Sequence, residues 1–363
     1  APATTLPPRL NWKGRLVSWL RSVSAPLWFP DERGQWRIWA RRRMYALLDE
    51  LQPDLVVCSH EPAVTLELGL AAAARGVRWA ADLGDPVLAP YTPWRWRRRA
   101  RALEAKVWRR ADLVTVTNDV TADLLERRHG RPGGQVLVLP QGFDDALAPA
   151  TAEPDWQGQL ELLFTGRFYP FRPAGPLLAA VAATPGVRLS VATDCAPPEL
   201  EEAARAQPEK FRVLGFLSHA QALEEQRRAH VLVNVGNALP AQIPGKLYEY
   251  LGAGRPLLHL VSGERDPVPA WLQLLGRGFS CANREQDIAA ALRNLHDLAA
   301  GGRMSASFRL GREAVAEFGW SRLAASAAAA FHAAAGKGTG KEQGWQEPGD
   351  RHTVQLQKGK QEQ

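Results

Sequence analysis

Short apolar runs alternate with helical stretches in the part of the chain between Pro53 and Pro140. The apolar runs predict buried strands, and the stretches between them predict helices. The strands are expected at 55–59, 77–83, 113–117 and 135–140, and the helices at 62–75, 94–110 and 119–129. Strands that alternate with helices predict right-handed βαβ units and a parallel sheet.

An amphipathic helix is expected before this series, from Asp31 to about Leu51. Apolar side chains recur there at intervals of three or four residues, at Trp36, Ala40, Met44, Leu47 and Leu51. That spacing places them on one helix face, and Asp31 can cap the start of the helix. Residues 1–30 are expected to form irregular or short helical structure.

A second alternating series follows residues 144–158, which are rich in Ala, Pro and acidic side chains and predict a linker. Its strands are expected at 160–166, 187–193, 211–216, 231–235, 256–261 and 278–282, with a helical region over 284–335. The predicted fold is α/β, with two Rossmann-like parallel-sheet domains that face a cleft. Doubly wound sheets of this kind bind ligands at the carboxyl ends of their strands.

The predicted domains follow from these two series. The first occupies residues 1–148 and the second residues 159–318, and a C-terminal helix covers 319–335. The tail over 336–363 is rich in Gly, Lys, Gln and Glu with few apolar residues, so it is expected to be disordered.

Composition excludes several classes of protein. No run of 18 or more apolar residues occurs, which argues against a spanning helix. The three cysteines stand far apart without a CxxC pair, which argues against a zinc ribbon and a disulfide framework. Lone cysteines fit a reducing compartment, and we expect a cytoplasmic protein. Arginine far exceeds lysine and alanine is abundant, which favours a GC-rich, bacterial source.

The net charge of +7 is placed unevenly along the chain. Residues 1–110 carry 19 Lys and Arg against 10 Asp and Glu, and they hold nine of the 13 tryptophans. A basic surface favours anionic partners, which include lipid headgroups, sugar phosphates and nucleic acids. No nucleic-acid-binding motif occurs in the chain, so a nucleic-acid partner is not expected.

The segment PGKLYEYLGAGRP at 244–256 is the most informative stretch for chemistry. A short helix is expected to begin at Gly245, and its free N–H groups and positive dipole end suit a diphosphate. Lys246 adds a full charge there, and Glu249, one turn later, can accept hydrogen bonds from the two hydroxyls of a ribose. The alternative interpretation is an amphipathic helix with a capping glycine and a solvated Lys–Glu pair.

Four segments resemble the motifs of retaining, family-4-type glycosyltransferases with the GT-B fold. EYLGAGRP (249–256) resembles their Glu–x–x–Ala/Gly–x–Gly–x–Pro signature, and LLFTGRFYPFRP (162–173) resembles the element that opens their donor domain. The segment 114–144 resembles the end of their acceptor domain, and SHEP (59–62) resembles a cleft histidine after a strand. The resemblance covers about residues 54–330 and implies the fold more strongly than the substrate.

The resemblance implies roles for particular residues on the donor side. Glu249 would bind the ribose, and Gly166 would let the backbone approach the donor. The helix start near Gly245 would help to stabilise the donor phosphates. Arg167, Arg172 and Lys246 would hold the donor phosphates, with Arg172 in place of the commoner Lys. The nucleobase would lie against Leu214, Gly215 and Phe216.

On the acceptor side, His60 would line the cleft near the transferred sugar. Asp82 and Asp85, in DLGDP (82–86), could contact an acceptor hydroxyl. Each of these residues has an alternative interpretation as an ordinary solvated or hydrogen-bonded loop residue.

Two departures from the family pattern stand out. Many members carry an earlier Glu eight residues before the ribose-binding one, and Ala241 occupies that position here. Members also open with a strand, a Gly-rich loop and a helix, and no such element is recognisable before residue 54. We therefore expect the N-terminal domain to be incomplete through loss of this opening element.

The basic stretch PWRWRRRARALEAKVWRR (93–110) predicts a helix with two faces. Trp96, Ala100, Leu103 and Val107 recur at helical spacing and are expected to pack on the domain, while the arginines occupy the other face. That face is either a solvated basic surface or a site for docking on an anionic membrane, where Trp and Arg suit the interface. A membrane surface would fit a lipid-linked acceptor.

The leading hypothesis is transfer of a sugar from a nucleotide-diphosphate donor to an acceptor hydroxyl in polysaccharide or glycolipid synthesis. Protein cations would stabilise the departing diphosphate, which predicts no obligatory metal and no further cofactor. The resemblance implies retention at the anomeric carbon. One alternative is a degenerate GT-B protein that binds a nucleotide sugar without catalysis, and another is a nucleotide-sugar epimerase on the same scaffold.

Overall fold

The structure is a computed structural model of the 363-residue chain. It describes residues 29–30, 33–146, 153–169, 172–237, 242–264 and 266–336. The expected irregular start, the Asp31 cap, the loss of an opening strand and the disorder of 337–363 fall outside these residues. Ala241 does so as well. The described residues divide into two compact units, one that contains those up to Val138 together with Ala328–Gly336, and the other those in Leu139–Ala327.

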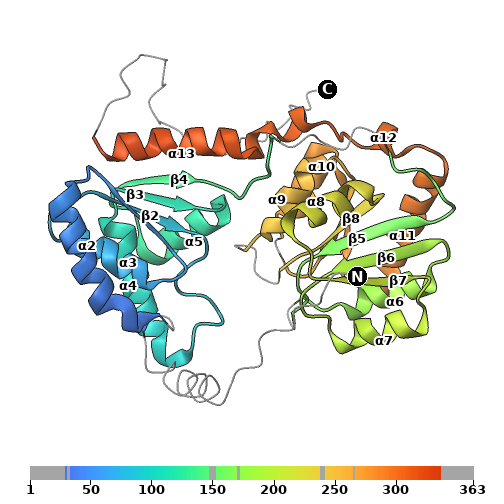
Figure 1. Cartoon of the computed structure of the whole chain (residues 1–363), viewed down its shortest axis with the longest axis horizontal. Coiled ribbons are helices and arrows are strands. Elements are labelled where there is room, and N and C mark those ends of the chain that lie inside the picture. Colours follow the sequence, from blue (N-terminus) through green and yellow to red (C-terminus); the bar gives the residue numbers. More distant parts are fainter. Residues whose placement is uncertain are drawn as a thin grey trace. The chain divides into compact units, whose positions relative to one another are not determined.

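The first unit is built on a four-stranded parallel sheet with the order β1-β2-β3-β4 (Figure 1). Its strands are β1 (Val56–Ser59), β2 (Trp79–Leu83), β3 (Leu113–Val116) and β4 (Gln135–Val138). Three helices connect them: α3 (Val64–Ala73), α4 (Arg97–Arg110), which follows the short η3 (Trp94–Trp96), and α5 (Asp119–His129). The predicted alternation is confirmed, with strand limits that differ by one or two residues.

Both faces of this sheet are covered. The strand order advances in one direction, so right-handed crossovers place all three connecting helices on one face. Trp79 and Ala81 point to that side, where they belong to a buried apolar cluster with residues of α3 and α4. Ala80 and Leu113 point to the other side and pack against the last turns of α13 (Trp320–Ala334). Arg78 Nη1 also donates to the Ala334 carbonyl at 3.0 Å.

The predicted helix before β1 exists as the short η2 (Gly34–Trp36) followed by α2 (Arg37–Leu51). The apolar face predicted for it is only partly covered, since Ala40, Met44 and Leu47 are half-buried while Trp36 and Leu51 at its ends are 56% and 65% exposed. Leu48 is the residue of α2 that is buried. The helix packs on α3, where Arg37 Nη1 lies 3.0 Å from Glu67 Oε2.

The chain enters the second unit before the end of the predicted linker at 144–158. Phe143 exchanges backbone hydrogen bonds of 3.0 Å with Phe318 and Trp320. Ser321 then donates its N–H and hydroxyl to Asp145 Oδ1 at 3.2 and 3.1 Å. Residues 147–152 of the predicted linker lie outside the described part of the chain.

The second unit is built on a six-stranded parallel sheet with the order β10-β9-β8-β5-β6-β7 (Figure 1). The strands are β5 (Leu160–Thr165), β6 (Val187–Ala192), β7 (Phe211–Gly215), β8 (Val231–Val235), β9 (Leu257–Val261) and β10 (Gly278–Ala282). In chain order this is the doubly wound arrangement, in which the direction of strand addition reverses between β5 and β8.

Helices cover both faces of the second sheet. One face carries α6 (Gly175–Ala183), α7 (Pro198–Ala206) and α11 (Glu285–Ala300), and the other carries α8 (His219–Arg228), α9 (Gly245–Gly252) and α10 (Val268–Leu275). Side chains alternate along each strand, so Leu162 and Phe164 join the α6 and α11 core while Leu163 joins the α9 and α10 core. The helical region ends with α12 (Met304–Ser307), η4 (Arg312–Phe318) and α13.

No helix in the described ranges has both the length and the apolar character needed to cross a membrane.

Candidate active site

The reversal of strand order defines where a ligand fits in the second unit. In doubly wound sheets the crevice lies outside the carboxyl ends of the strands on either side of the reversal. Here these are the ends of β5 and β8. Arg172, in the loop after β5, donates from Nη2 to Asn237 Oδ1 in the loop after β8. Asn237 in turn donates to the Gln242 carbonyl at 2.7 Å, so one chain of hydrogen bonds ties the two loops together.

Gly166 and Arg167 open the loop after β5. Gly166 has φ +141°, a backbone conformation that favours glycine, and its N–H donates to the Ala192 carbonyl at 3.0 Å. Arg167 then projects its guanidinium as a fork onto Asp194, with Nε 2.6 Å from Oδ1 and Nη2 on Oδ2. Asp194 lies directly beyond β6. The pair is open to solvent, since the two side chains are 54% and 35% exposed.

The Arg167–Asp194 pair keeps both partners charged. The hydrogen bond and charge of Asp194 raise the pKa of Arg167 above its ordinary value. The same hydrogen bond lowers the pKa of the Asp194 carboxyl. Arg172 is more enclosed, and burial lowers the pKa of its guanidinium. Its carbon Cζ also lies 5.7 Å from the centre of the Tyr169 ring.

The first turn of α9 carries the second group of predicted residues. Gly245 is its first residue, and Lys246 Nζ lies 3.0 Å from both carboxylate oxygens of Glu249. Glu249 is only 14% exposed. Two residues of α8 reach the same carboxylate: Gln226 donates from Nε2 to Oε1, and His219 Nδ1 lies 3.7 Å from Oε2. Glu249 is therefore held from three sides.

A buried tyrosine fixes α9 against the end of β5. The Tyr250 hydroxyl accepts a hydrogen bond of 2.7 Å from the Thr165 N–H and lies 2.9 Å from the Thr165 hydroxyl. Burial raises the pKa of Tyr250, so its hydroxyl stays protonated at neutral pH. Thr165 directly precedes Gly166. This contact thus sets the position of the Lys246–Glu249 pair relative to the loop that carries the two arginines.

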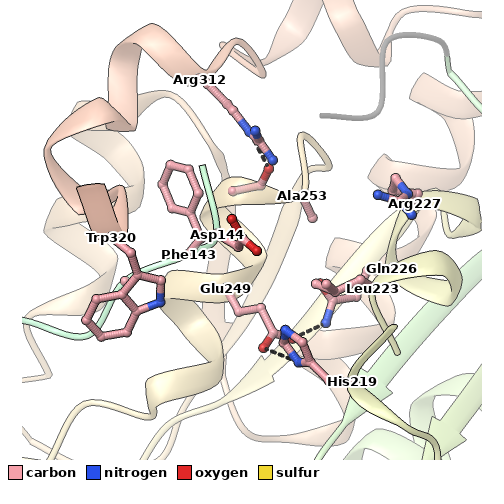
Figure 2. Close-up of a pocket in the computed structure, with 12 residues that line it drawn as sticks. Phe143, Asp144, His219, Leu223, Gln226, Arg227, Glu249, Ala253, Arg312 and Trp320 are labelled. Atoms are coloured by element: carbon pink, nitrogen blue, oxygen red, sulfur yellow. Dashed lines mark hydrogen bonds and ion pairs between the residues drawn. The ribbon is translucent and has the colours of Figure 1, made fainter. Parts of the chain in front are cut away.

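A pocket runs along α8 and α9 and reaches Glu249 at one end (Figure 2). Figure 2 shows Glu249, His219 and Gln226 pointing toward one another, with Trp320 and Phe143 on another wall. The lining residues are Gly142, Phe143, Asp144, His219, Leu223, Gln226, Arg227, Glu249, Gly252, Ala253, Arg312 and Trp320. Gly252 must be small, because a Cβ there would meet the Phe143 ring at 2.3 Å.

The predicted donor residues therefore form two groups rather than one. Arg167 and Arg172 lie in the loop after β5, while Lys246 and Glu249 lie on α9, and of these four only Glu249 lines the pocket. The hydrogen bonds of Tyr250 to Thr165 join α9 to the end of β5, from which the loop with the two arginines continues.

The predicted nucleobase platform lies at the sheet edge formed by β7. Leu214 is half-buried, Gly215 has φ +70°, and Phe216 is 80% exposed. Three residues later α8 begins with His219, after a capping box formed by Ser218 and Gln221. The exposed Phe216 ring thus precedes the helix that faces Glu249, and its contact with a base stays a prediction.

The predicted acceptor-side residues belong to the first unit. His60 follows β1, and its N–H donates to the Asp82 carbonyl at 2.7 Å. Asp82 accepts hydrogen bonds from Ser59 Oγ at 2.9 Å and Thr115 Oγ1 at 2.6 Å, so its carboxylate links three neighbouring strands. Asp85 is half-buried in the loop after β2. The catalytic or acceptor roles of these residues stay predictions.

Sequence reasoning missed four residues that contact the predicted ones. Asp194 follows a predicted strand, so its place at the carboxyl edge was available from the sequence, but its pairing with Arg167 was not. Asn237 likewise follows the strand β8. Gln226 and His219 reach Glu249 only because α8 packs beside α9, and the sequence contains no signal for that contact.

The three cysteines differ in their surroundings. Cys58 and Cys281 are enclosed, and burial raises the pKa of each thiol to about 11. Cys195 is exposed in the turn after β6, next to Asp194, where its N–H lies 3.3 Å from Thr193 Oγ1.

Comparison with known proteins agrees with this fold. Residues 2–147 match the model of Glycosyltransferase Family 4. Sucrose-phosphate synthase from Thermosynechococcus elongatus has a similar structure, with 17% identity and a TM-score of 0.60 over 81% of this chain and 76% of that one. No curated protein matches the chain in sequence.

Two further solved structures are similar. HepE from Anabaena, in complex with UDP-glucose, has 15% identity and a TM-score of 0.60 over 80% of this chain and 81% of its own. WaaG, a glycosyltransferase involved in lipopolysaccharide biosynthesis, has 14% identity and a TM-score of 0.55 over 76% and 85%. The two sheets therefore form a GT-B fold. Over residues 2–147, the match to Glycosyltransferase Family 4 confirms the predicted resemblance to family-4-type glycosyltransferases.

Proposed function

We propose that this protein transfers a sugar from a nucleoside-diphosphate donor to an acceptor hydroxyl. One observation carries the proposal. The loop after β5, with Arg167 and Arg172, and the helix after β8, with Lys246 and the partly buried Glu249, both follow the strands at which the strand order reverses in the second unit. The similar HepE structures, with UDP-glucose and with UDP and glucose, support a donor of this class.

The difficult step is departure of the nucleoside diphosphate, because negative charge grows on its phosphate oxygens as the glycosidic bond breaks. Cations that are already in place stabilise that charge most in the transition state. Arg167 and Arg172 supply two such charges from the loop after β5, and Lys246 supplies a third from the first turn of α9, where the helix dipole also favours negative charge. Glu249 accepts the ribose hydroxyls.

The finer parts of the proposal come from the family resemblance. They are retention at the anomeric carbon, no obligatory metal or further cofactor, and His60 beside the transferred sugar. Asp82 and Asp85 would contact the acceptor, and Leu214, Gly215 and Phe216 the base. Proton NMR of the first product formed gives the anomeric outcome. Turnover that survives EDTA supports metal independence, and activity restored only by Mg²⁺ or Mn²⁺ would reject it.

The test of the proposal is donor turnover by Arg167→Ala and Glu249→Ala. Each change is expected to lower the rate about 10²- to 10³-fold, the size seen when one transition-state contact is removed. Arg188→Ala is the matched control, since Arg188 pairs with Glu161 in the same sheet and at a similar exposure. Rates like the wild type in both site variants would remove the assignment.

Two alternatives are separated by the same assay. Nucleotide-sugar binding without turnover of any acceptor would favour a degenerate binding protein. Formation of the epimeric sugar nucleotide without an acceptor would favour an epimerase. A role in polysaccharide or glycolipid synthesis calls for sugar or lipid-linked acceptors in this screen.

We also propose that the first unit docks on an anionic membrane from the cytoplasmic side. The support is the two-sided character of α4: Ala100, Leu103 and Val107 are buried as predicted, while the arginines between them are exposed. Trp94, just before the helix, is 84% exposed. Aromatic and arginine side chains together suit a lipid headgroup layer.

Flotation with vesicles that contain anionic lipid tests this surface. Wild type is expected to float at low salt, and Trp94→Ala combined with Arg98→Gln and Arg101→Gln to float several-fold less. Protein that stays in the soluble fraction at low salt would reject the docking surface.

A further inference from the structure

Lys246 and Glu249 of the proposed donor site form an ion pair with each other. Lys246 Nζ bridges both oxygens of Glu249 at 3.0 Å across one helical turn. The two differ in exposure, because Lys246 is 41% exposed and Glu249 only 14%. The lysine can therefore leave into solvent, whereas the carboxylate stays where the helix holds it.

The hydrogen bonds already made to Glu249 leave too few acceptor positions for a ribose. A carboxylate offers about four lone-pair positions, two on each oxygen. Lys246 and Gln226 both donate to Oε1, and Lys246 also donates to Oε2. His219 stands 3.7 Å from Oε2, beyond hydrogen-bond distance. One position remains, while the two neighbouring hydroxyls of a ribose need two.

We propose that Lys246 is a selectivity residue that makes this site bind nucleoside diphosphates in preference to free nucleosides. This inference rests on the proposed function. A diphosphate draws the ammonium of Lys246 away from Glu249 and satisfies its charge, which frees the carboxylate for the ribose. A nucleoside offers no such partner, so its ribose must displace the lysine without compensation. Recognition of the ribose and of the diphosphate is thereby coupled through one side chain.

This coupling differs from a simple contribution of positive charge. A lysine that only attracts phosphate has no effect on nucleoside affinity. A lysine that only supports the helix raises the affinity for both ligands or for neither. A lysine that blocks the carboxylate lowers nucleoside affinity while it raises diphosphate affinity. Removal of Lys246 must then move the two affinities in opposite directions.

The experiment compares wild type with Lys246→Met, which keeps the side-chain length and removes the charge. Dissociation constants are measured by ligand-observed NMR for UDP and uridine, and likewise for GDP with guanosine and ADP with adenosine. For the pair whose diphosphate binds wild type, we expect nucleoside affinity to rise about two- to fivefold in the variant, as release of a half-exposed ion pair allows. Diphosphate affinity is expected to fall about tenfold with loss of a charge-assisted contact.

Two further variants keep the result specific. Arg228→Met removes an exposed cation from the i,i+4 pair with Glu224 on α8 and is expected to change neither affinity. In Lys246→Met combined with Glu249→Gln the gain in nucleoside affinity is expected to disappear, because the gain acts through the carboxylate. Thermal unfolding of each variant reports on its folding.

Several outcomes would overturn the inference. Nucleoside affinity in Lys246→Met that is unchanged, lower, or too weak to measure would show that the lysine does not block Glu249. A gain that persists in the double variant would do the same. If wild type binds none of the three diphosphates, the proposed function fails together with the inference, and that result is read from wild type alone.

Discussion

The two sheets that the described residues form are built from the same βαβ unit, yet within those residues only the second sheet contains a reversal of strand order. In the first sheet each new strand is added on the same side, so its helices lie on one face and α13 covers the other. In the second sheet the order turns back at β5 and β8, and the loops after these strands meet. The difference shows how one repeated unit gives sheets of two topologies, of which the second has the edge where we propose that the donor binds.

Among tests of this comparison, the largest effect is expected from a mutation in the core of the first unit. Trp79 is fully buried, and its Nε1 donates to the Arg110 carbonyl at 2.9 Å. Trp79→Ala is expected to lower the free energy of unfolding of the first unit by about 3–5 kcal/mol and to leave nucleotide affinity unchanged. Urea unfolding with and without UDP measures both. A loss of UDP binding in folded protein would contradict the assignment of the donor site to the second unit.

A middle-sized effect is expected from the contact that positions α9. Tyr250→Phe removes the hydroxyl that accepts from the Thr165 N–H and leaves that buried group without its partner. The free energy of unfolding is expected to fall by about 1–3 kcal/mol, and donor affinity to fall with it. Tyr45→Phe in α2 is the control, since it keeps the ring against which Arg75 packs. Unaltered stability and donor binding in Tyr250→Phe would show that the contact does not hold the site together.

The smallest effect is expected at Asp194. Its carboxylate pairs with the guanidinium of Arg167, which would otherwise be open to a ligand. The pair is exposed, so Asp194→Asn is expected to change folding stability little and to strengthen diphosphate binding about two- to fivefold. Isothermal titration with UDP measures the change. Weaker binding in the variant would show that Asp194 orients Arg167 instead of competing for it.

The pH dependence of this pair has a defined sign. Arg167 lowers the pKa of Asp194 in the folded chain, so the pair contributes stability above the ordinary pKa of aspartate. That contribution is lost as the pH falls through the lowered pKa. The small difference in folding stability between wild type and Asp194→Asn is therefore expected to persist throughout the neutral range and to vanish only in strong acid.

Much of the fold could be predicted from the sequence, because apolar runs and helical spacing mark elements locally. The strands of both sheets were predicted to within about two residues, and the buried face of α4 was predicted correctly from Ala100, Leu103 and Val107. The apolar face before β1 is covered only in its middle, because Ala40, Met44 and Leu47 are half-buried while Trp36 and Leu51 are exposed.

The candidate site was only partly predictable for the same reason. Glu249 and Lys246 are one turn apart on a single helix, so their proximity follows from the sequence. Asp194 is 27 residues from Arg167, and Gln226 is 23 residues from Glu249. Pairings over such distances depend on which strands and helices become neighbours, and hydrophobic patterning does not determine that.

The thiols of the chain have a practical consequence. Cys58 is buried and Cys281 half-buried, and burial raises the pKa of both thiols to about 11, whereas Cys195 is exposed beside the Arg167–Asp194 pair. A maleimide dye should accordingly attach at a single position without prior removal of native cysteines. The label would sit at the rim of the donor crevice, and its fluorescence would respond when a nucleotide draws Arg167 away from its carboxylate.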